Sequence, residues 1–198
     1  MKIILIGIIA YFIGNISGGI ILSKLVYKQD IREHGSGNAG STNALRVFGK
    51  KAGAFTFIID FLKGLIITYV GGKLQGDLGV FVAGLFVVLG HDWPAIYGFK
   101  GGKGIATSFG VLVAISPIHI LAVFVIFVIV VVATKYVSLG SIIAALLCIL
   151  VGGYFILSKN NNYIGILYIV LALITTFKHR ANIKRLFTGK ETKIKLKK

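Results

Sequence analysis

Long apolar stretches constrain this chain more than any other feature of its sequence. About 20 consecutive apolar residues form a helix that crosses the hydrocarbon layer of a membrane. The chain has seven predominantly apolar stretches, separated by turns or polar loops, at residues 3–24, 52–72, 77–97, 105–116, 118–134, 137–157 and 163–178. We therefore predict an all-α, polytopic integral membrane protein with seven transmembrane helices.

Two of these stretches have distinctive ends. The fourth is short and stops at Ser116-Pro117, because proline restrains the residue before it and breaks a helix. It is expected to form a short span or a re-entrant segment. The first has no small-x-small cleavage site at Ser23-Lys24-Leu25, so we expect a permanent helix rather than a signal peptide.

The positive charges divide unequally between the two sides of this arrangement. Of 22 Lys and Arg residues, 18 fall in loops on one side, 3 on the other, and Lys63 lies within a helix. Because short cytoplasmic loops carry the excess of positive charge, we predict an external N-terminus and a cytoplasmic C-terminus. The length of 198 residues supports one domain over 1–198, with 188–198 as a basic cytoplasmic tail.

Composition excludes several kinds of site. The 6 acidic residues are dispersed, which leaves no clustered carboxylates for a metal ion or for paired acid–base chemistry. The single cysteine, Cys148, allows no disulfide framework. A net charge of +16 suits anionic lipids or phosphorylated substrates. Nucleic acid is disfavoured because an apolar chain lacks a soluble basic face.

The first polar island is HGSGNAGSTNALR, His34 to Arg46. It places glycines among hydroxyl and amide side chains and ends in a cation, a composition that suits a phosphate bound by main-chain N–H groups and a guanidinium. The alternative is a glycine-rich turn before a helix that Ser41 or Thr42 caps.

The second island is GHDWPAIYGFKGGKGIAT, Gly90 to Thr107. Its glycines allow close approach of the backbone to a ligand, and Lys100 and Lys103 supply charge for a phosphate. It is no Walker A loop, because Tyr97 and Gly104 stand where that motif needs Gly and Ser or Thr. A flexible loop with lysines at the level of the lipid head groups is the alternative.

The third island is KHRANIKRLFTGKE, Lys178 to Glu191, directly after the last apolar stretch. In a continuing helix His179, Asn182 and Arg185 would lie on roughly one face. A polybasic helix that binds anionic lipid is the alternative. Because all three islands fall on the predicted cytoplasmic side, we expect one anionic site.

Asp60 and Lys63 lie within the second apolar stretch. Ionisable residues at such depth are candidates for function, but an opposite pair three residues apart also neutralises itself. We predict a structural pair that faces the helix bundle.

Together the three islands resemble, in order and spacing, the motifs of the bacterial membrane acyltransferases called PlsY, which use acyl-phosphate to acylate glycerol-3-phosphate. The resemblance covers nearly the whole chain and includes an Asp-x-x-Lys-Gly sequence at Asp60 to Gly64. One departure is Asn15-Ile16-Ser17, which lacks the proline of the family's first helix.

The resemblance implies a seven-helix enzyme of the bacterial plasma membrane with its active site on the cytoplasmic side. Its reaction would transfer a fatty acyl group to the 1-hydroxyl of glycerol-3-phosphate, the first acylation of phospholipid biosynthesis. The products would be lysophosphatidic acid and inorganic phosphate. Membrane lipids would surround the protein, and no metal, cofactor or obligate protein partner is implied.

The resemblance also implies the site residues. Those with catalytic roles are His179, Asn182 and Ser36; those that bind substrate are Gly37, Asn38, Thr42, Asn43, Arg46, Gly101, Gly102 and Lys103; Glu191 is structural, like Asp60 and Lys63. By its ordinary pKa of about 6.5, His179 is the favoured side-chain base, with a substrate phosphate as the alternative. Whether Arg46 or Lys103 holds a given phosphate stays open.

Three rival functions fit the sequence less well. Acyltransferases that use acyl-CoA or acyl-carrier protein commonly need His-x-x-x-x-Asp, and no histidine here has Asp five residues later. A transporter or flippase for phosphorylated solutes would need a polar route through the bundle. The predicted helices contain no buried charges besides Asp60 and Lys63, which disfavours such a route. A structural lipid-binding protein would not explain the two glycine-rich islands.

Overall fold

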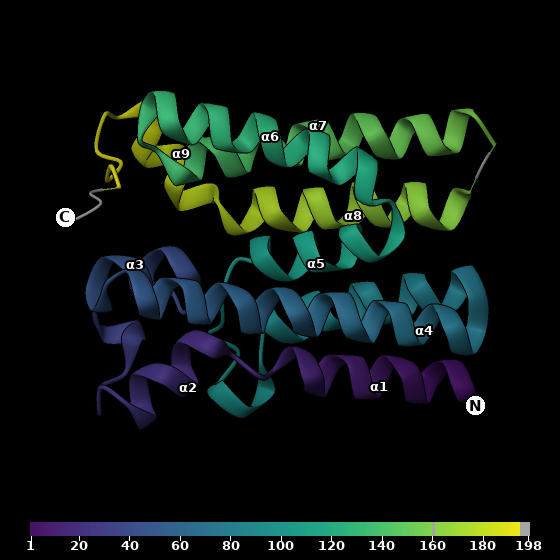
Figure 1. Cartoon of the computed structure of the whole chain (residues 1–198), viewed down its shortest axis with the longest axis horizontal. Coiled ribbons are helices and arrows are strands. Elements are labelled where there is room, and N and C mark those ends of the chain that lie inside the picture. Colours follow the sequence, from purple (N-terminus) through teal and green to yellow (C-terminus); the bar gives the residue numbers. More distant parts are fainter. Residues whose placement is uncertain (160, 195–198) are drawn as a thin grey trace. The chain divides into compact units, whose positions relative to one another are not determined.

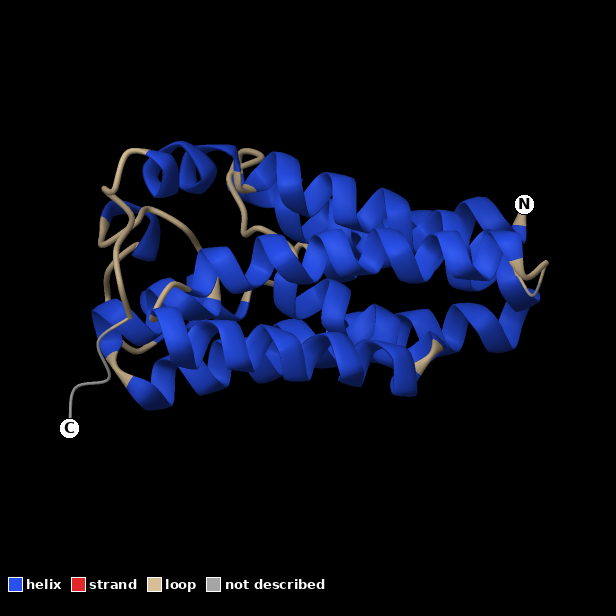
Figure 2. Cartoon of the chain, turned by 90° about the horizontal axis from the view of Figure 1, so that it is seen from above, coloured by secondary structure: helices blue, strands red, loops and turns tan. Residues whose placement is uncertain are grey.

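The computed structural model describes residues 1–159 and 161–194, and within them every regular element is a helix (Figure 2). The α-helices are α1 Lys2–Gly14, α2 Gly18–Leu25, α3 Ser41–Phe48, α4 Lys50–Asp92, α5 Ile105–Ile115, α6 Pro117–Thr134, α7 Val137–Leu157, α8 Asn162–Lys178 and α9 Arg180–Phe187. Two short 3₁₀ helices are η1 Ile31–Glu33 and η2 Ala95–Tyr97. The all-α prediction is confirmed for these residues, and 195–198 of the predicted tail lie outside them.

The chain forms two compact units, one up to Ala114 and one from Ile115 onward. In the first unit α1, α2 and α3 pack against α4. In the second unit α6 and α8 pack against α7 (Figure 1). The first and second islands belong to the first unit, and the third island belongs to the second.

α4 is a helical hairpin rather than one rod. Its 43 residues would extend for about 65 Å as a straight helix, twice the thickness of a hydrocarbon layer. The helical backbone breaks at Gln75 and Gly76, whose φ is 56°. A side-chain carbon at Gly79 would collide with the main-chain oxygen of Gly71, so the two halves pack tightly after the reversal. The break separates the predicted stretches 52–72 and 77–97.

The first apolar stretch is also interrupted. α1 and α2 meet at an angle of 41° across residues 15–17. The side chain of Ser17 accepts a hydrogen bond from the N–H of Ile20 at 3.4 Å and thereby caps α2. The chain therefore bends here without the proline of the family.

The second unit follows the sequence closely. α6 begins at Pro117, as the Ser116-Pro117 break predicted, and Lys135 ends it with a φ of 63°. Small residues bring α7 and α8 together, since a side-chain carbon at Gly152 would lie 2.6 Å from the main-chain oxygen of Gly165. The Ser116 and Tyr168 hydroxyls share a hydrogen bond of 2.6 Å.

Among the described residues, three helices are long and apolar enough to cross a membrane, or up to five if each bent pair counts as one span. α5 has only 11 residues, in agreement with the predicted short fourth segment. In α6 only Ile120 and Val123 are buried, although nearly all of its side chains are apolar. Such exposure is typical of a helix surrounded by lipid.

Candidate active site

Asn43 forms the centre of the first island. Its side-chain nitrogen lies 2.9 Å from the main-chain oxygens of both His34 and Asn38, and 3.3 Å from that of Ile31. Its side-chain oxygen accepts from the N–H of Ser36 at 2.9 Å. Asn43 is buried, and these bonds occupy both its donor and its acceptor groups. It therefore fixes the path of the loop.

Two glycines give this loop its turns. Gly35 and Gly37 have φ values of 61° and 70°, in the left-handed region that favours glycine. A side-chain carbon at Gly35 would also collide with the side-chain oxygen of Asn43. Ser36, between them, is exposed.

The loop leads into α3, which begins at Ser41. The N-cap residue is Gly40, so the alternative expectation that Ser41 or Thr42 caps this helix is wrong. The N–H of Gly40 instead donates to the side chain of Asn38 at 2.9 Å. Arg46 is exposed in the last turn of α3, and no carboxylate of the described residues forms an ion pair with it.

The second island begins in the last turn of α4, and its later residues fold back onto that turn. The N–H of Gly102 donates to the main-chain oxygen of His91 at 3.1 Å. A side-chain carbon at Gly102 would collide with the ring of His91, and one at Gly101 would collide with the main-chain oxygen of His91. The two glycines therefore allow the loop to lie against the last turn of α4. Lys103 follows directly and is half-buried.

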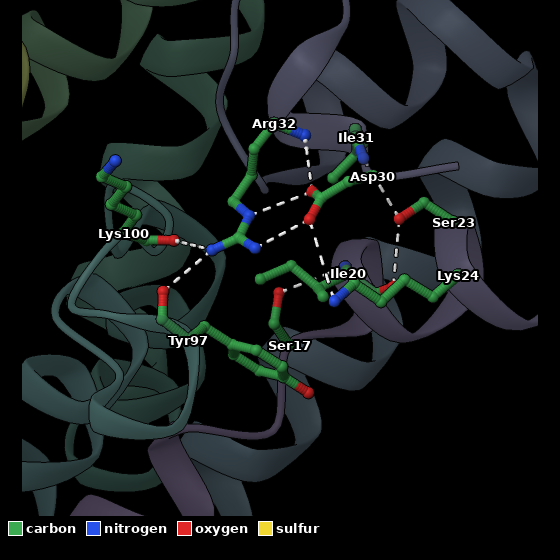
Figure 3. A network of polar contacts seen from close by, with 9 residues as sticks. All are labelled: Ser17, Ile20, Ser23, Lys24, Asp30, Ile31, Arg32, Tyr97 and Lys100. Carbon is green, nitrogen blue, oxygen red and sulfur yellow. Dashed lines mark hydrogen bonds and ion pairs between the residues drawn. The ribbon is translucent and has the colours of Figure 1, made fainter. Parts of the chain in front are cut away.

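Arg32, two residues before the first island, bonds to the second island within the first unit (Figure 3). Its guanidinium donates to the main-chain oxygen of Tyr97 at 2.8 Å and lies 3.5 Å from that of Lys100. Two further bonds, of 3.0 and 2.7 Å, join it to the carboxylate of Asp30. In the sequence, Arg32 is only one of several charges in a predicted loop. Its partners among the carbonyls lie 65 residues or more away, and no sequence pattern marks them.

The Asp30 carboxylate is held in its ionised form. The hydrogen bond from Arg32 lowers the pKa of Asp30 from an ordinary value of 3.8 to about 2. The same pairing raises the pKa of Arg32. Lys24 adds a longer contact of 3.8 Å to this carboxylate. A carboxylate of its own turn and two main-chain oxygens of the second island therefore hold the Arg32 guanidinium.

The third island does not continue α8 as a straight helix. α8 and α9 meet at 58°, and His179 lies at the bend between them. The Nδ1 atom of His179 is 2.8 Å from the main-chain oxygen of Thr175. Because a carbonyl oxygen only accepts, Nδ1 is the donor, and in the neutral ring the lone pair lies on Nε2.

Glu191 holds α9 to α7. Asn182 and Ser138 donate to one of its oxygens at 2.7 and 2.8 Å, and Arg185 donates to the other at 2.7 Å. Burial raises the pKa of Glu191, but these three hydrogen bonds lower it further than burial raises it, so the pKa is below its ordinary value. Asn182 and Arg185 share one face of α9, and both contact this carboxylate. No sequence pattern marks Ser138 as a partner of this carboxylate.

Asp60 and Lys63 form an ion pair of 2.9 Å inside the first unit, and both are buried. His91 joins them from the other half of α4, with Nδ1 2.8 Å from the Lys63 nitrogen. A histidine from a different segment is a partner that the spacing of Asp60 and Lys63 could not reveal.

A family model and individual relatives all match glycerol-3-phosphate acyltransferases. The model of the family "Glycerol-3-phosphate acyltransferase" matches residues 4–189. A glycerol-3-phosphate acyltransferase of Finegoldia magna is 56% identical over 194 residues, which cover 98% of this chain and 97% of the relative. One of Listeria monocytogenes is 39% identical over 198 residues, with 98% of each chain covered.

Two solved structures share the fold. The crystal structure of PlsY, an integral membrane glycerol 3-phosphate acyltransferase, in its glycerol 3-phosphate form has a TM-score of 0.91 and 37% identity, and the match covers 98% of this chain and 96% of that one. The lysophosphatidic acid form has a TM-score of 0.86 and 35% identity, with 99% and 97% covered. This chain belongs to the PlsY family of integral membrane glycerol-3-phosphate acyltransferases.

Proposed function

We propose that this protein transfers a fatty acyl group from acyl-phosphate to the 1-hydroxyl of glycerol-3-phosphate, giving lysophosphatidic acid and inorganic phosphate. The family and the glycerol 3-phosphate and lysophosphatidic acid forms of PlsY support the acceptor and the product. One observation supports a single site formed by both loops. Arg32 joins the loop built around Asn43 to the segment that precedes Lys103. It joins two glycine-rich loops with cations into one polar surface.

An acyl-phosphate donor requires only the kind of catalysis that the polar side chains of this surface can supply. The donor is a mixed anhydride, so its carbonyl carbon is already activated and phosphate is a good leaving group. The hydroxyl oxygen forms the new ester bond as the bond from the carbonyl carbon to the phosphate oxygen breaks. Orientation and charge stabilisation are then sufficient, without a covalent serine intermediate.

Cations and N–H groups of the first two islands hold the phosphates in this proposal. Arg46, exposed and without a carboxylate partner among the described residues, binds one phosphate, and Lys103 binds the other. The supporting donors are the hydroxyls of Ser36 and Thr42 and the main-chain N–H of Gly101. Gly37 and Gly102 act through the path of the backbone, since their own N–H groups donate to the carbonyls of His34 and His91. Asn38 and Asn43 act by shaping the loop, since their side chains bond to its backbone.

His179 and Asn182 of the third island complete the proposed chemistry. The bond from Nδ1 to Thr175 leaves the lone pair of the neutral ring on Nε2, as a general base for the acceptor hydroxyl requires. A phosphate oxygen of the substrate is the alternative base. In this proposal Asn182, oriented by Glu191, stabilises the oxyanion with its side-chain amide.

We further propose seven membrane crossings in a bacterial plasma membrane, with the site on the cytoplasmic side. The two halves of α4, the helices α6 and α7, the bent pairs at each end and the short α5 supply the seven segments. The presence of 18 Lys and Arg residues on one side, against 3 on the other, supports a cytoplasmic C-terminus.

A comparison of acyl donors tests the function. Purified protein receives glycerol-3-phosphate with either palmitoyl-phosphate or palmitoyl-CoA, and lysophosphatidic acid is measured with EDTA present. We expect product from palmitoyl-phosphate alone, its loss in Arg46→Ala and Lys103→Ala, and its retention in Lys51→Ala, which removes an exposed cation outside the islands. Product from palmitoyl-CoA alone would contradict the donor, and no product from either donor would contradict the function.

A further inference from the structure

Three ionisable side chains meet inside the first unit, apart from the proposed phosphate ligands. Asp60 and Lys63 lie one turn apart in the first half of α4, and His91 lies in the last turn of its second half. The Lys63 nitrogen is 2.9 Å from the Asp60 carboxylate and 2.8 Å from Nδ1 of His91. The exposed fractions of Asp60, Lys63 and His91 are 1%, 7% and 3%. Burial of charged groups costs desolvation free energy unless their partners compensate for it, so the contacts of these side chains explain why they are buried.

The ion pair satisfies backbone groups at the break between α1 and α2. Lys63 donates to the main-chain oxygens of Gly14 at 3.0 Å and Ile16 at 2.5 Å. In an unbroken helix these oxygens would accept from N–H groups four residues later. One of those N–H groups, that of Gly18, instead lies 3.4 Å from the Asp60 carboxylate. The pair thus replaces helix bonds that the bend removes.

The third contact of Lys63 reaches the second island through His91. Nδ1 of His91 lies 2.8 Å from the Lys63 nitrogen and 3.5 Å from the Asp60 carboxylate, so both members of the ion pair contact this edge of the ring. The Nε2 edge faces Gly102, where a side-chain carbon would collide with it. Gly102 also donates its N–H to the main-chain oxygen of His91 at 3.1 Å. The ring therefore forms the surface on which Gly102 lies, one residue before Lys103.

We propose that Lys63 and His91 are positioning residues for the phosphate-binding segment. Lys63, oriented by Asp60, fixes the ring of His91. The ring in turn determines how closely Gly102 approaches α4, and thereby the position of Lys103. The same ammonium group holds the bend between α1 and α2, so one buried cation links the first helix to the second island. The proposal rests on the proposed function in one respect, the binding of a phosphate by Lys103.

Steady-state kinetics test the positioning role. Lys103→Arg, which keeps the charge but moves it, first identifies the substrate whose KM depends on the position of this cation. Lys63→Met and His91→Ala are then expected to raise the KM of that same substrate by at least about fivefold, with kcat within about twofold of wild type. A lowered kcat at unchanged KM, as a smaller folded fraction of enzyme gives, would overturn the proposal.

A pair of glycine variants tests the contact without reference to activity. Gly102→Ala places a methyl group against the ring of His91, whereas Gly101→Ala places one against its main-chain oxygen. We expect His91→Ala to remove at least half of the fall in thermal midpoint caused by Gly102→Ala, and to leave the fall caused by Gly101→Ala unchanged. Equal falls for Gly102→Ala in both backgrounds would overturn the proposal. A protein without acyltransferase activity would fail the donor test but still give this result.

Discussion

Asn182 donates its side-chain amide to Glu191 at 2.7 Å, across the turn that ends α9. Ser138, in the first turn of α7, donates to the same oxygen at 2.8 Å. One carboxylate thus fixes the orientation of a proposed catalytic side chain and also joins α9 to α7. The chain beyond it is held as well, because the N–H of Ile194 donates to the main-chain oxygen of Lys135 at 2.8 Å.

Glu191→Ala is expected to destabilise the protein through this arrangement. It leaves the donors of Asn182, Ser138 and Arg185 without their acceptor, and each buried donor left unsatisfied costs about 1–3 kcal/mol. The thermal midpoint in detergent should fall and kcat should decrease. Lys190→Ala, at an exposed neighbouring position, is the control and should change neither. An unchanged midpoint in Glu191→Ala would contradict this role.

The pairing of Asp30 with Arg32 predicts a dependence of stability on pH. In the folded protein the pKa of Asp30 falls from 3.8 to about 2. The ionised carboxylate therefore contributes fully to the free energy of unfolding above about pH 4, and this contribution is lost as the pH falls toward 2. The difference in thermal midpoint between wild type and Asp30→Asn should be constant from pH 5 to 8 and smaller at pH 3. A difference that grows on acidification would have the wrong sign.

His179→Gln separates the two candidates for the general base. If His179 removes the proton from the acceptor hydroxyl, kcat should fall by about 10²–10⁴-fold with little change in KM. Arg180→Gln, which alters the exposed neighbour, is the control. A nearly normal kcat in His179→Gln would assign the proton to a phosphate oxygen of the substrate.

Single cysteines test the proposed orientation. In a Cys148→Ser background, Lys73→Cys and Lys159→Cys should react with a membrane-impermeant maleimide in intact cells, whereas Lys51→Cys and Lys190→Cys should react only after lysis. These positions lie in exposed turns or at helix ends. The reverse pattern would place the N-terminus in the cytoplasm.

Hydropathy and prolines sufficed to predict most of the helices. The break at Ser116-Pro117 and the bounds of α7 follow directly from the sequence, because apolar length and helix-breaking residues are local properties. The bend at residues 15–17 depends instead on Lys63 and Asp60, which are more than forty residues away. Local patterns therefore locate the helices but do not reveal the side chains that hold their bends.

The candidate site was predictable in its residue types more than in its contacts. Glycines, amides and cations marked the first island as a candidate phosphate site, but the pattern did not distinguish Asn43, whose side chain bonds to the loop, from exposed Ser36. Neither Arg32 nor His91 stood out, because each acts on a segment that the fold brings to it. Contacts between distant segments leave no periodic signal in a single sequence.

An isotope experiment tests the central claim most directly, which is attack of the glycerol-3-phosphate hydroxyl on the carbonyl carbon of acyl-phosphate. Glycerol-3-phosphate labelled with oxygen-18 at the 1-hydroxyl is incubated with palmitoyl-phosphate and wild-type protein, and the products are analysed by mass spectrometry. The account predicts labelled lysophosphatidic acid and an equal amount of unlabelled inorganic phosphate. Lysophosphatidic acid without the label, or phosphate released without lysophosphatidic acid, would contradict it.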